Sequence, residues 1–380
     1  MLFFILFSSV LFGMYLFVGW RFIYPLEVTP LLKTILGLIM FLFYCLPLLI
    51  FYFHFNRIDT PFTRVINWLG YTGLGTVSLL FFIQLGVEFY EGVKLIIGKT
   101  HQFDPRRRAF LGLTAKQIAG GLAATGTLWG VYTATKKPEI VKIDIPIENL
   151  PPQLKGLRLA QITDLHVGSM ITGKFVKQVT DSLKSLNADM VFFTGDAADG
   201  SVEHFGKYMD SFSTVRPKYG KFFVTGNHEY YSDMNGWLRK IESLGFKILV
   251  NESQNIVING ATLMITGIPD RGGRHFSKFH RTDMEKAVGG MAEPDAKILL
   301  AHQPKDVEHA VKYNFNLQLS GHTHGGQYFP FSLLVQLAHP FIKGLHKREN
   351  TWIYVNQGTG YWGPPMRIGT VPEITEITLV

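Results

Sequence analysis

Residues 157–166 read Leu-Arg-Leu-Ala-Gln-Ile-Thr-Asp-Leu-His, an apolar run that ends in a carboxylate and an imidazole two positions apart. A short aliphatic run of this kind is typical of a buried β-strand. Similar runs rich in β-branched or aromatic residues predict further strands at 190–194, 221–225, 262–266, 297–301 and 317–320. Helical spacing of apolar residues at 173–186 and 236–244 separates some of them. This alternation predicts an α/β fold in which helices cover a largely buried sheet.

Two more strands are predicted near the end of the chain, at 352–355 and 373–379, and we expect both to close a second sheet. The predicted domain therefore covers residues 139–380 and contains mixed sheets flanked by helices. No internal repeat or low-complexity tract interrupts it.

Polar motifs follow five of the predicted strands directly, at the carboxyl ends where open α/β sheets place their ligands. The motifs are Asp164-Leu165-His166, Gly195-Asp196-Ala197-Ala198-Asp199, Gly226-Asn227-His228-Glu229, His302 and Gly321-His322-Thr323-His324-Gly325-Gly326-Gln327. Their carboxylates, imidazoles and asparagine carbonyl form a mixed oxygen and nitrogen donor set that suits Mn²⁺, Fe or Zn²⁺. A single histidine is usually an ordinary residue, which we expect of His204, His275, His280, His309, His339 and His346. Convergence of five strand ends instead predicts a metal site.

In this order the motifs resemble those of the calcineurin-like metallophosphoesterase superfamily. Three of them, in the extended forms Asp-Leu-His-x-Gly, Gly-Asn-His-Glu-Tyr-Tyr and Gly-His-Thr-His-Gly-Gly-Gln, resemble its membrane-anchored YkuE/YaeI-type branch, as does a late Gly-Pro-Pro-x-Arg-x-Gly. The resemblance spans essentially residues 139–380. It implies a metallophosphoesterase-type β-sandwich of mixed sheets flanked by helices.

The resemblance also implies two divalent metal ions, with Mn as the first expectation and Fe or Zn as alternatives. One ion would be held by Asp164, His166, Asp196 and His324. The other would be held by Asp196, Asn227, His302 and His322. Asp196 would bridge the pair, since a carboxylate has two oxygens that can each face a cation.

The same resemblance implies a mechanism in which a metal-bridging hydroxide attacks the phosphorus atom in line with the leaving group. His228 would be the general acid that protonates the departing alkoxide, and the alternative is that it is a further metal ligand. We expect Asp199 and Glu229 to orient ligating or catalytic imidazoles. Two glycines, Gly325 and Gly326, would allow close approach of the substrate. Asp270 is a candidate for the lip of the site.

The part before this domain, residues 1–138, is predicted to be an all-α transmembrane region of three to four helices. Apolar runs at 2–20, 34–55 and 68–87 are each about as long as a helix that crosses a hydrocarbon core of roughly 30 Å. A fourth run, 110–132, is richer in Gly, Ala and Thr and contains Lys116. These segments predict an integral membrane protein of the cell membrane, with the lipid bilayer as a partner.

Residues 106–112, Arg-Arg-Arg-Ala-Phe-Leu-Gly, resemble a twin-arginine export signal, which makes the export machinery a candidate partner. The alternative is an ordinary basic flank of a membrane helix. Either way, the cluster of positive charges is expected on the cytoplasmic side. The catalytic domain is then extracytoplasmic if 110–132 crosses the bilayer, and cytoplasmic if it does not.

The net charge of +8 does not indicate a nucleic-acid partner, because it is concentrated before the catalytic domain. Up to Pro138 the chain has twelve Lys and Arg against five acids, which accounts for +7. A nucleic-acid-binding domain normally has a basic face of its own. The single cysteine, Cys45, excludes an intrachain disulfide.

The function expected from these features is a membrane-anchored, dinuclear-metal-dependent phosphoesterase that hydrolyses phosphomonoesters or phosphodiesters. One alternative is a pyrophosphatase of lipid-linked diphosphates, suggested by the membrane segments. A more distant alternative is a transporter or channel with a phosphate-binding regulatory domain. The apolar runs 2–20, 34–55 and 68–87 contain few of the charged residues that a substrate pathway usually needs, which disfavours this alternative.

Overall fold

The computed structural model describes residues 2–97 and 105–380, and within helices it does not describe the side chains of 2–3, 61 and 105–113. The twin-arginine-like stretch 106–112 therefore lies outside the described side chains. The chain forms two compact units. One contains the residues up to Tyr132 together with 363–366, and the other contains Thr133–Trp362 and Arg367–Val380.

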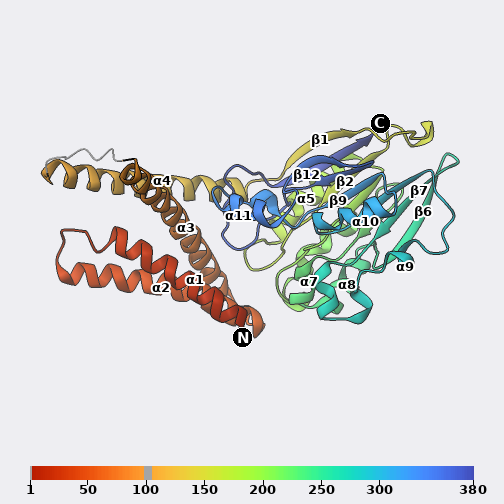
Figure 1. The fold of residues 1–380 in the computed structure, drawn as a ribbon. Coiled ribbons are helices and arrows are strands. Elements are labelled where there is room, and N and C mark those ends of the chain that lie inside the picture. The colour runs from red at the N-terminus through yellow and green to blue at the C-terminus, as the bar shows by residue number, and fades with distance from the viewer. Residues whose placement is uncertain (1, 98–104) are drawn as a thin grey trace. The chain divides into compact units, whose positions relative to one another are not determined.

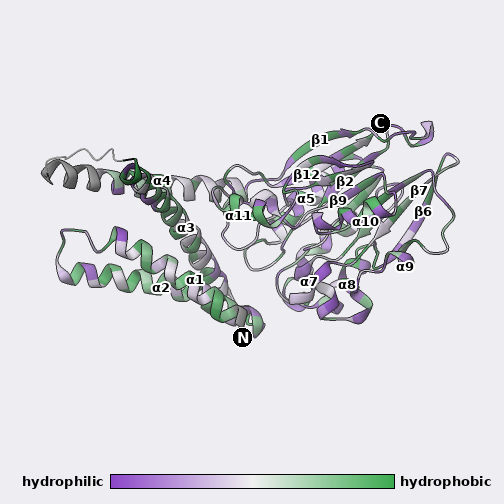
Figure 2. Cartoon of the chain, in the orientation of Figure 1, coloured by the Kyte–Doolittle hydropathy of each residue, from purple (hydrophilic) through white to green (hydrophobic). Residues whose placement is uncertain are grey.

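The first unit is helical, with α1 (Leu2–Phe22), α2 (Pro30–Phe55), α3 (Pro61–Ile96) and α4 (Pro105–Thr135) (Figure 1). Helices α2 and α3 begin with a threonine cap followed by proline, whose fixed φ suits the first helical position. Within the described residues, three segments are long and apolar enough to cross a membrane: Phe4–Phe22, Pro30–Phe55 and Phe62–Ile96. Their hydrophobic character is visible in Figure 2. These are the three apolar runs expected from the sequence, with helices longer than predicted.

The second unit contains two six-stranded sheets, which confirms the mixed α/β fold. Their orders are β1-β12-β2-β3-β4-β5 and β10-β11-β9-β8-β7-β6. In the first sheet β2 to β5 are parallel, and in the second β7, β8, β9 and β11 are parallel. The strand bounds are β1 Glu139–Ile145, β2 Arg158–Ile162, β3 Met190–Phe193, β4 Lys221–Phe223, β5 Phe246–Ile248, β6 Glu252–Ile258, β7 Ala261–Gly267, β8 Ala296–Leu300, β9 Leu317–Ser320, β10 Gly344–Arg348, β11 Thr351–Val355 and β12 Glu373–Leu379.

Helices flank these sheets, as predicted for 173–186 and 236–244. The helix bounds are α5 Gly173–Leu186, α6 Val202–Phe205, α7 Asn227–Tyr231, α8 Met234–Ser243, α9 Met284–Val288, α10 Val307–Lys312 and α11 Phe331–Ala338. Helix α5 buries Val176, Val179 and Leu183 on one face, as its amphipathic spacing requires.

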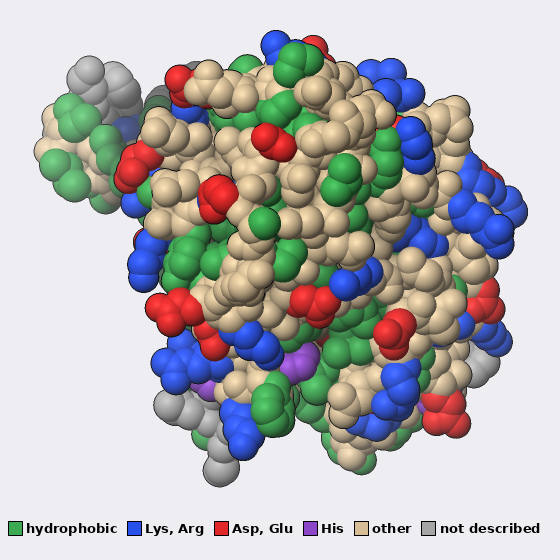
Figure 3. All heavy atoms as spheres, turned by 90° about the vertical axis from the view of Figure 1, so that its right-hand side faces the viewer, with side chains coloured by type: hydrophobic (Ala, Val, Ile, Leu, Met, Phe, Trp, Pro, Cys, Tyr) green, Lys and Arg blue, Asp and Glu red, His purple; other side chains and the backbone are tan. Residues whose placement is uncertain are grey.

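On the face of the molecule drawn in Figure 3, Lys and Arg are interspersed with Asp and Glu.

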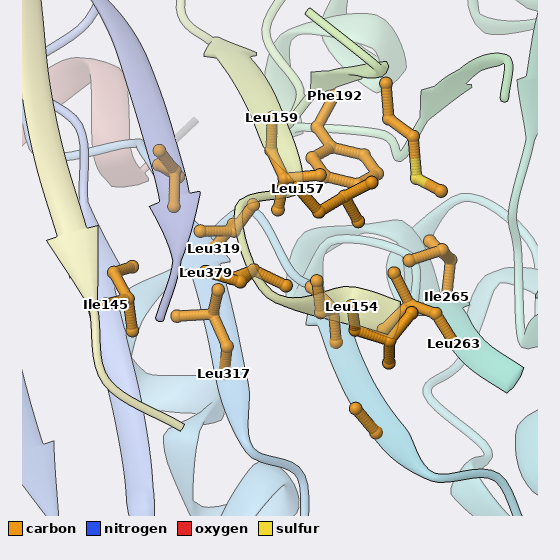
Figure 4. Close-up of a cluster of buried hydrophobic side chains, with 14 of the residues drawn as sticks. Ile145, Leu154, Leu157, Leu159, Phe192, Leu263, Ile265, Leu317, Leu319 and Leu379 are labelled. Atoms are coloured by element: carbon orange, nitrogen blue, oxygen red, sulfur yellow. The ribbon is translucent and has the colours of Figure 1, made fainter. Parts of the chain in front are cut away.

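A core of aliphatic and aromatic side chains joins the two sheets (Figure 4). Leu159 and Phe192 come from the first sheet, and Leu263, Leu317 and Leu319 come from the second. A separate cluster packs α5 and α8 against the other face of the first sheet. The inter-sheet core therefore fixes how far apart the carboxyl ends of the two sets of strands lie.

One strand was assigned to the wrong sheet. The prediction placed 373–379 in a second sheet, but β12 lies in the first sheet, parallel to β1 and antiparallel to β2. Its alternating side chains reach both hydrophobic clusters, since Ile377 lies in the inter-sheet core and Ile374 in the cluster under α5. The assignment of 352–355 to the second sheet is confirmed by β11.

We expect Leu319→Ala to destabilise the second unit by about 2–5 kcal/mol, because it leaves a cavity in the inter-sheet core. The measurement is the midpoint of urea unfolding of the full-length protein in mild detergent, followed by tryptophan fluorescence. Val257→Ala is the control, since Val257 is 66% exposed. Equal midpoints for the two variants would contradict the role given to this core.

Candidate metal centre

The polar motifs after β2, β3 and β9 contain an unusual number of left-handed backbone conformations. Six residues other than glycine have positive φ there: Asp164 (51°), His166 (50°), Asp196 (52°), His322 (72°), His324 (50°) and Gln327 (53°). Such conformations are costly for residues with a Cβ atom and cluster at functional sites. Backbone hydrogen bonds hold two of them, from Asp164 N to Gly195 O and from His166 N to Asp196 O.

Two glycines allow the loops to approach each other closely. A Cβ atom on Gly226 would lie 2.0 Å from Asp196 Oδ1, and one on Gly321 would lie 2.2 Å from Asp164 Oδ2. No side chain fits at either position. Because they lack a Cβ atom, these two glycines let the backbone of their loops contact the buried carboxylates directly.

The first group of donor atoms comes from Asp164, His166 and His324, whose candidate ligand atoms all lie within 4.8 Å of one another. His166 Nε2 lies 3.1 Å from His324 Nε2 and 3.9 Å from Asp164 Oδ1. Asp164 and His166 follow β2, and His324 follows β9. The structure thus brings together residues that follow strands of different sheets.

The second group comes from Asp196, His302 and His322, with the same limit of 4.8 Å. His302 Nε2 lies 3.1 Å from Asp196 Oδ2 and 3.2 Å from His322 Nδ1. His302 Nδ1 donates to the backbone oxygen of Thr194 at 2.7 Å, which leaves Nε2 to face the cluster. Asn227 follows β4, and its buried Oδ1 accepts no hydrogen bond from any described residue.

Asp196 connects the two groups. Its Oδ2 atom also lies 3.8 Å from His166 Nε2, and a third trio of donor atoms comprises Asp196, His166 and His228. Buried carboxylates, imidazoles and an amide oxygen without a partner form a donor set that fits divalent cations with oxygen and nitrogen ligands.

Burial and neighbouring charges leave two of the histidines neutral. Burial and His302 lower the pKa of His322 well below its usual value. Burial, His166 and Arg367 do the same for the pKa of His324. Neutral imidazoles have the free lone pair that binds a metal. Burial alone would raise the pKa of Asp196, but His302 and His228 outweigh it and hold this pKa well below the ordinary range.

Glu229 connects the loop after β3 to the loop after β4. Its carboxylate accepts hydrogen bonds from the backbone amides of Asp196 (3.0 Å), Ala197 (2.7 Å) and Gly226 (2.6 Å). The predicted role for Glu229 was to orient an imidazole. The structure instead shows it bonded to backbone amides of the motifs after β3 and β4.

Asp199 lies between two imidazoles, as expected for an orienting carboxylate. One oxygen accepts a hydrogen bond from His228 Nδ1, and the other lies 3.2 Å from His166 Nδ1. Burial disfavours the charged form of His228, but Asp199 and Asp196 outweigh it and raise its pKa to about 9. The two carboxylates therefore favour the protonated form of the His228 imidazole.

Two other predicted residues differ in detail from expectation. Asp270 is buried rather than on a lip, and accepts hydrogen bonds from Gly272 N and Gln303 Nε2. The absence of a side chain on Gly326 makes room for Ser332 of α11, because a Cβ atom on Gly326 would lie 2.5 Å from that of Ser332. The lack of a side chain at position 326 therefore allows α11 to pack against this loop.

Sequence reasoning missed two residues beside the cluster. His339, left as an ordinary histidine, places its ring 5.1 Å from that of His322. Fully buried Arg367 donates to the backbone oxygens of Gln357 (2.8 Å), Gly358 (2.9 Å) and Gly360 (2.6 Å). Arg367 stands in the late Gly-Pro-Pro-x-Arg-x-Gly motif, which was the available signal, whereas no local signal marked His339.

We expect Arg367→Lys to lower the stability of the catalytic domain by about 1–3 kcal/mol, although the charge is kept. An ammonium group cannot reproduce the fork of donors, so buried carbonyl oxygens lose their partners. The measurement is the thermal unfolding midpoint of full-length protein in detergent. Arg239→Lys is the control, because Arg239 is exposed, and an equal midpoint in both variants would refute this role.

Comparison with known proteins agrees with the site geometry. Residues 157–326 match the family model described as calcineurin-like phosphoesterase. A zebrafish (Danio rerio) protein described as a transmembrane protein with metallophosphoesterase domain is 34% identical, over 86% of this chain and 76% of its own length. A Helicobacter pylori protein described as an uncharacterized metallophosphoesterase is 35% identical, over 80% of each chain.

The expected branch is also represented. The Bacillus subtilis metallophosphoesterase YkuE is 28% identical, over 72% of this chain and 97% of its own length. These similarities extend beyond the metal-site motifs into the rest of the catalytic domain. The chain belongs to the calcineurin-like metallophosphoesterases, and is a metal-dependent hydrolase of phosphoric esters.

Proposed function

We propose that the protein is a membrane-anchored phosphoesterase that hydrolyses phosphomonoesters or phosphodiesters at a centre of two divalent metal ions. Residues 1–138 form the membrane region in this proposal, and residues 139–380 form the catalytic domain. The observation that carries the proposal is the position of Asp196, whose carboxylate belongs to two adjoining groups of buried donors.

Seven residues are proposed as metal ligands. Asp164, His166 and His324 would hold one ion with Asp196, and Asn227, His302 and His322 would hold the other with Asp196. The buried, unpartnered Oδ1 of Asn227 supports its part in this set, because no described residue donates a hydrogen bond to it. Two cations, when bound, supply neutralisation of the phosphoryl oxygens and a lower pKa for a nucleophilic water. Manganese is the first candidate, with iron and zinc as alternatives.

His228 is proposed as the general acid. The hydrogen bond that His228 Nδ1 donates to Asp199 fixes the ring and leaves Nε2 to donate a proton to the leaving oxygen of the ester. Asp199 and Asp196 raise the pKa of His228 and so favour the form of the imidazole that carries this proton. Trp362 and Tyr231 lie against His228, with ring centroids 5.4 Å and 5.5 Å away, and restrict its orientation.

The membrane location rests on three apolar helices, within the described residues, that are long enough to span a bilayer. The zebrafish relative is itself described as a transmembrane protein. We propose that residues 110–132 also cross the bilayer, which places the catalytic domain outside the cytoplasm. The positive charges of Lys94, Lys99 and the arginines at 106–108 are then on the cytoplasmic side. The export machinery is a partner if the twin-arginine-like stretch is used.

Asp196→Asn is expected to lose the bound metal ions, because an amide lacks the negative charge needed to bridge two cations. The measurement is metal content by mass spectrometry after purification of full-length protein and Mn²⁺ loading. Asp295→Asn is the control, since Asp295 caps the backbone of Thr262 away from the cluster and should keep two metal ions per chain. Retention of both metal ions by the Asp196→Asn variant would contradict the role of Asp196 as the bridging ligand.

His228→Ala is expected to keep its metal ions and to lower turnover of an aryl phosphoester roughly 10²-fold or more, the usual scale of acid catalysis. Turnover and metal content are measured on the same preparation. His204→Ala is the matched control, because His204 is exposed and bonds to Ser201. Loss of metal in His228→Ala would instead identify His228 as a ligand, the alternative that its place in a donor trio allows.

A further inference from the structure

Helix α11 exposes an apolar surface beside the metal centre. Its sequence, Phe-Ser-Leu-Leu-Val-Gln-Leu-Ala, contains no charged residue, and none of its eight residues, all of which the structure describes, is buried. Leu333 and Leu334 are exposed, and Leu337 is 86% exposed. Phe329, just before the helix, is exposed as well. A helix of a globular domain normally buries its apolar side chains, as α5 does, so this surface requires a partner.

Both ends of α11 are fixed to the motif that contains His322 and His324. At the start, Ser332 packs against Gly326, two residues after His324. At the end, the ring of His339 lies against that of His322, and Thr323 Oγ1 donates to the backbone oxygen of Ile342 at 2.6 Å. The exposed leucines therefore stand at a fixed place relative to the cluster of donor atoms.

Exposed aromatic residues continue this surface on the side of His228. Trp362 and Tyr231 are both exposed, and both rings contact His228. Gln327 ties the Trp362 backbone to the segment before α11, because its Nε2 donates to Trp362 O at 2.9 Å and its Oε1 accepts from Trp362 N at 3.0 Å. Exposed aromatic rings thus lie beside His228, and Trp362 is hydrogen-bonded to the segment that precedes α11.

We propose that α11 lies in the headgroup region of a lipid bilayer, and that the substrate is an amphiphilic phosphoester whose apolar part stays in that bilayer. This rests on the phosphoesterase function proposed above. An amphiphile would place its phosphate at the donor cluster while α11 and the flanking aromatic residues contact its acyl or isoprenoid part.

The chemistry of α11 favours a bilayer over a protein partner. The same chain contains three segments apolar enough to span a membrane, so the domain is tethered to a bilayer in the proposed arrangement. Exposed Lys343 follows soon after the carboxyl end of α11. Uncharged apolar residues followed by a lysine match the boundary between acyl chains and anionic headgroups. The helix is only about 12 Å long, which is small for a stable protein interface of roughly 800 Å² per partner.

Site-directed fluorescence tests the position of α11 without any assay of activity. Full-length protein with Cys45→Ala is labelled with bimane at Leu337→Cys or, as the matched control, at exposed Val257→Cys. Each is reconstituted in phosphatidylcholine and phosphatidylglycerol vesicles that contain brominated lipid. We expect brominated lipid to quench the label at 337 and not at 257, and aqueous iodide to quench the label at 257 several-fold more.

Two results of this experiment would overturn the proposal. Equal quenching by iodide at 337 and 257 would show that α11 faces water. Protection of 337 from both quenchers would show that protein covers it, whether from this chain or from a second copy.

Activity tests the substrate class. The triple variant Leu333→Ser, Leu334→Ser, Leu337→Ser should hydrolyse phosphatidic acid in vesicles at least 10-fold more slowly, with less than a twofold change for soluble p-nitrophenyl phosphate. Val257→Ser should match wild type on both. An equal loss on both substrates, or no loss on either, contradicts the proposal, as does a wild type that cleaves only the soluble ester. A wild type inactive on both substrates with metal bound would refute the phosphoesterase function, while the fluorescence result would still decide the place of α11.

Discussion

The carboxylate of Asp196 has to face two groups of donor atoms at once, and the two-sheet architecture meets this requirement. Its Oδ2 atom lies 3.1 Å from an imidazole nitrogen of His302 and 3.8 Å from one of His166. His302 follows β8 in the second sheet, whereas His166 follows β2 in the first. The spacing of these groups is therefore set by the hydrophobic core between the sheets, which contains Leu159 and Leu300 from the strands concerned.

The same arrangement concentrates buried charge. Burial raises the pKa of Asp164 more than the nearby His302 lowers it, so this carboxylate is costly to ionise where it stands. Backbone amides offset part of that cost, because His322 N donates to Asp164 and His228 N donates to Asp196. Like charges held this close are expected where cations normally bind between them. The left-handed backbone of both aspartates shows that the loops also accept conformational strain to hold the carboxylates there.

Sequence reasoning reached the parts of this structure that are encoded locally. Strand-forming runs such as 317–320 and the motifs behind them could be recognised, because each strand and its polar end are adjacent in the chain. The position of β12 in the first sheet could not be predicted. This strand pairs with β1 and β2, which are far away in the sequence, and nothing in residues 373–379 indicates which strands they pair with. His339 was missed for the same reason. Its approach to His322 depends on the whole length of α11 between them.

Helix α11 and the metal-site loops depart from ordinary patterning in opposite ways. The loops bury ionisable groups such as Asp196 and His302, whereas α11 exposes leucines such as Leu337. Both departures occur within one segment of sequence, since His324 and Leu333 are nine positions apart. In most of a protein, apolar side chains are buried and ionisable ones are exposed. Exceptions to this rule are expected at functional sites, where a ligand can contact the exceptional residues. A bound cation would compensate the charge of the buried carboxylates, and an apolar phase would remove the leucine side chains from water. An amphiphilic phosphoester is the class of molecule that presents an anionic group to the first while keeping its chain in the second.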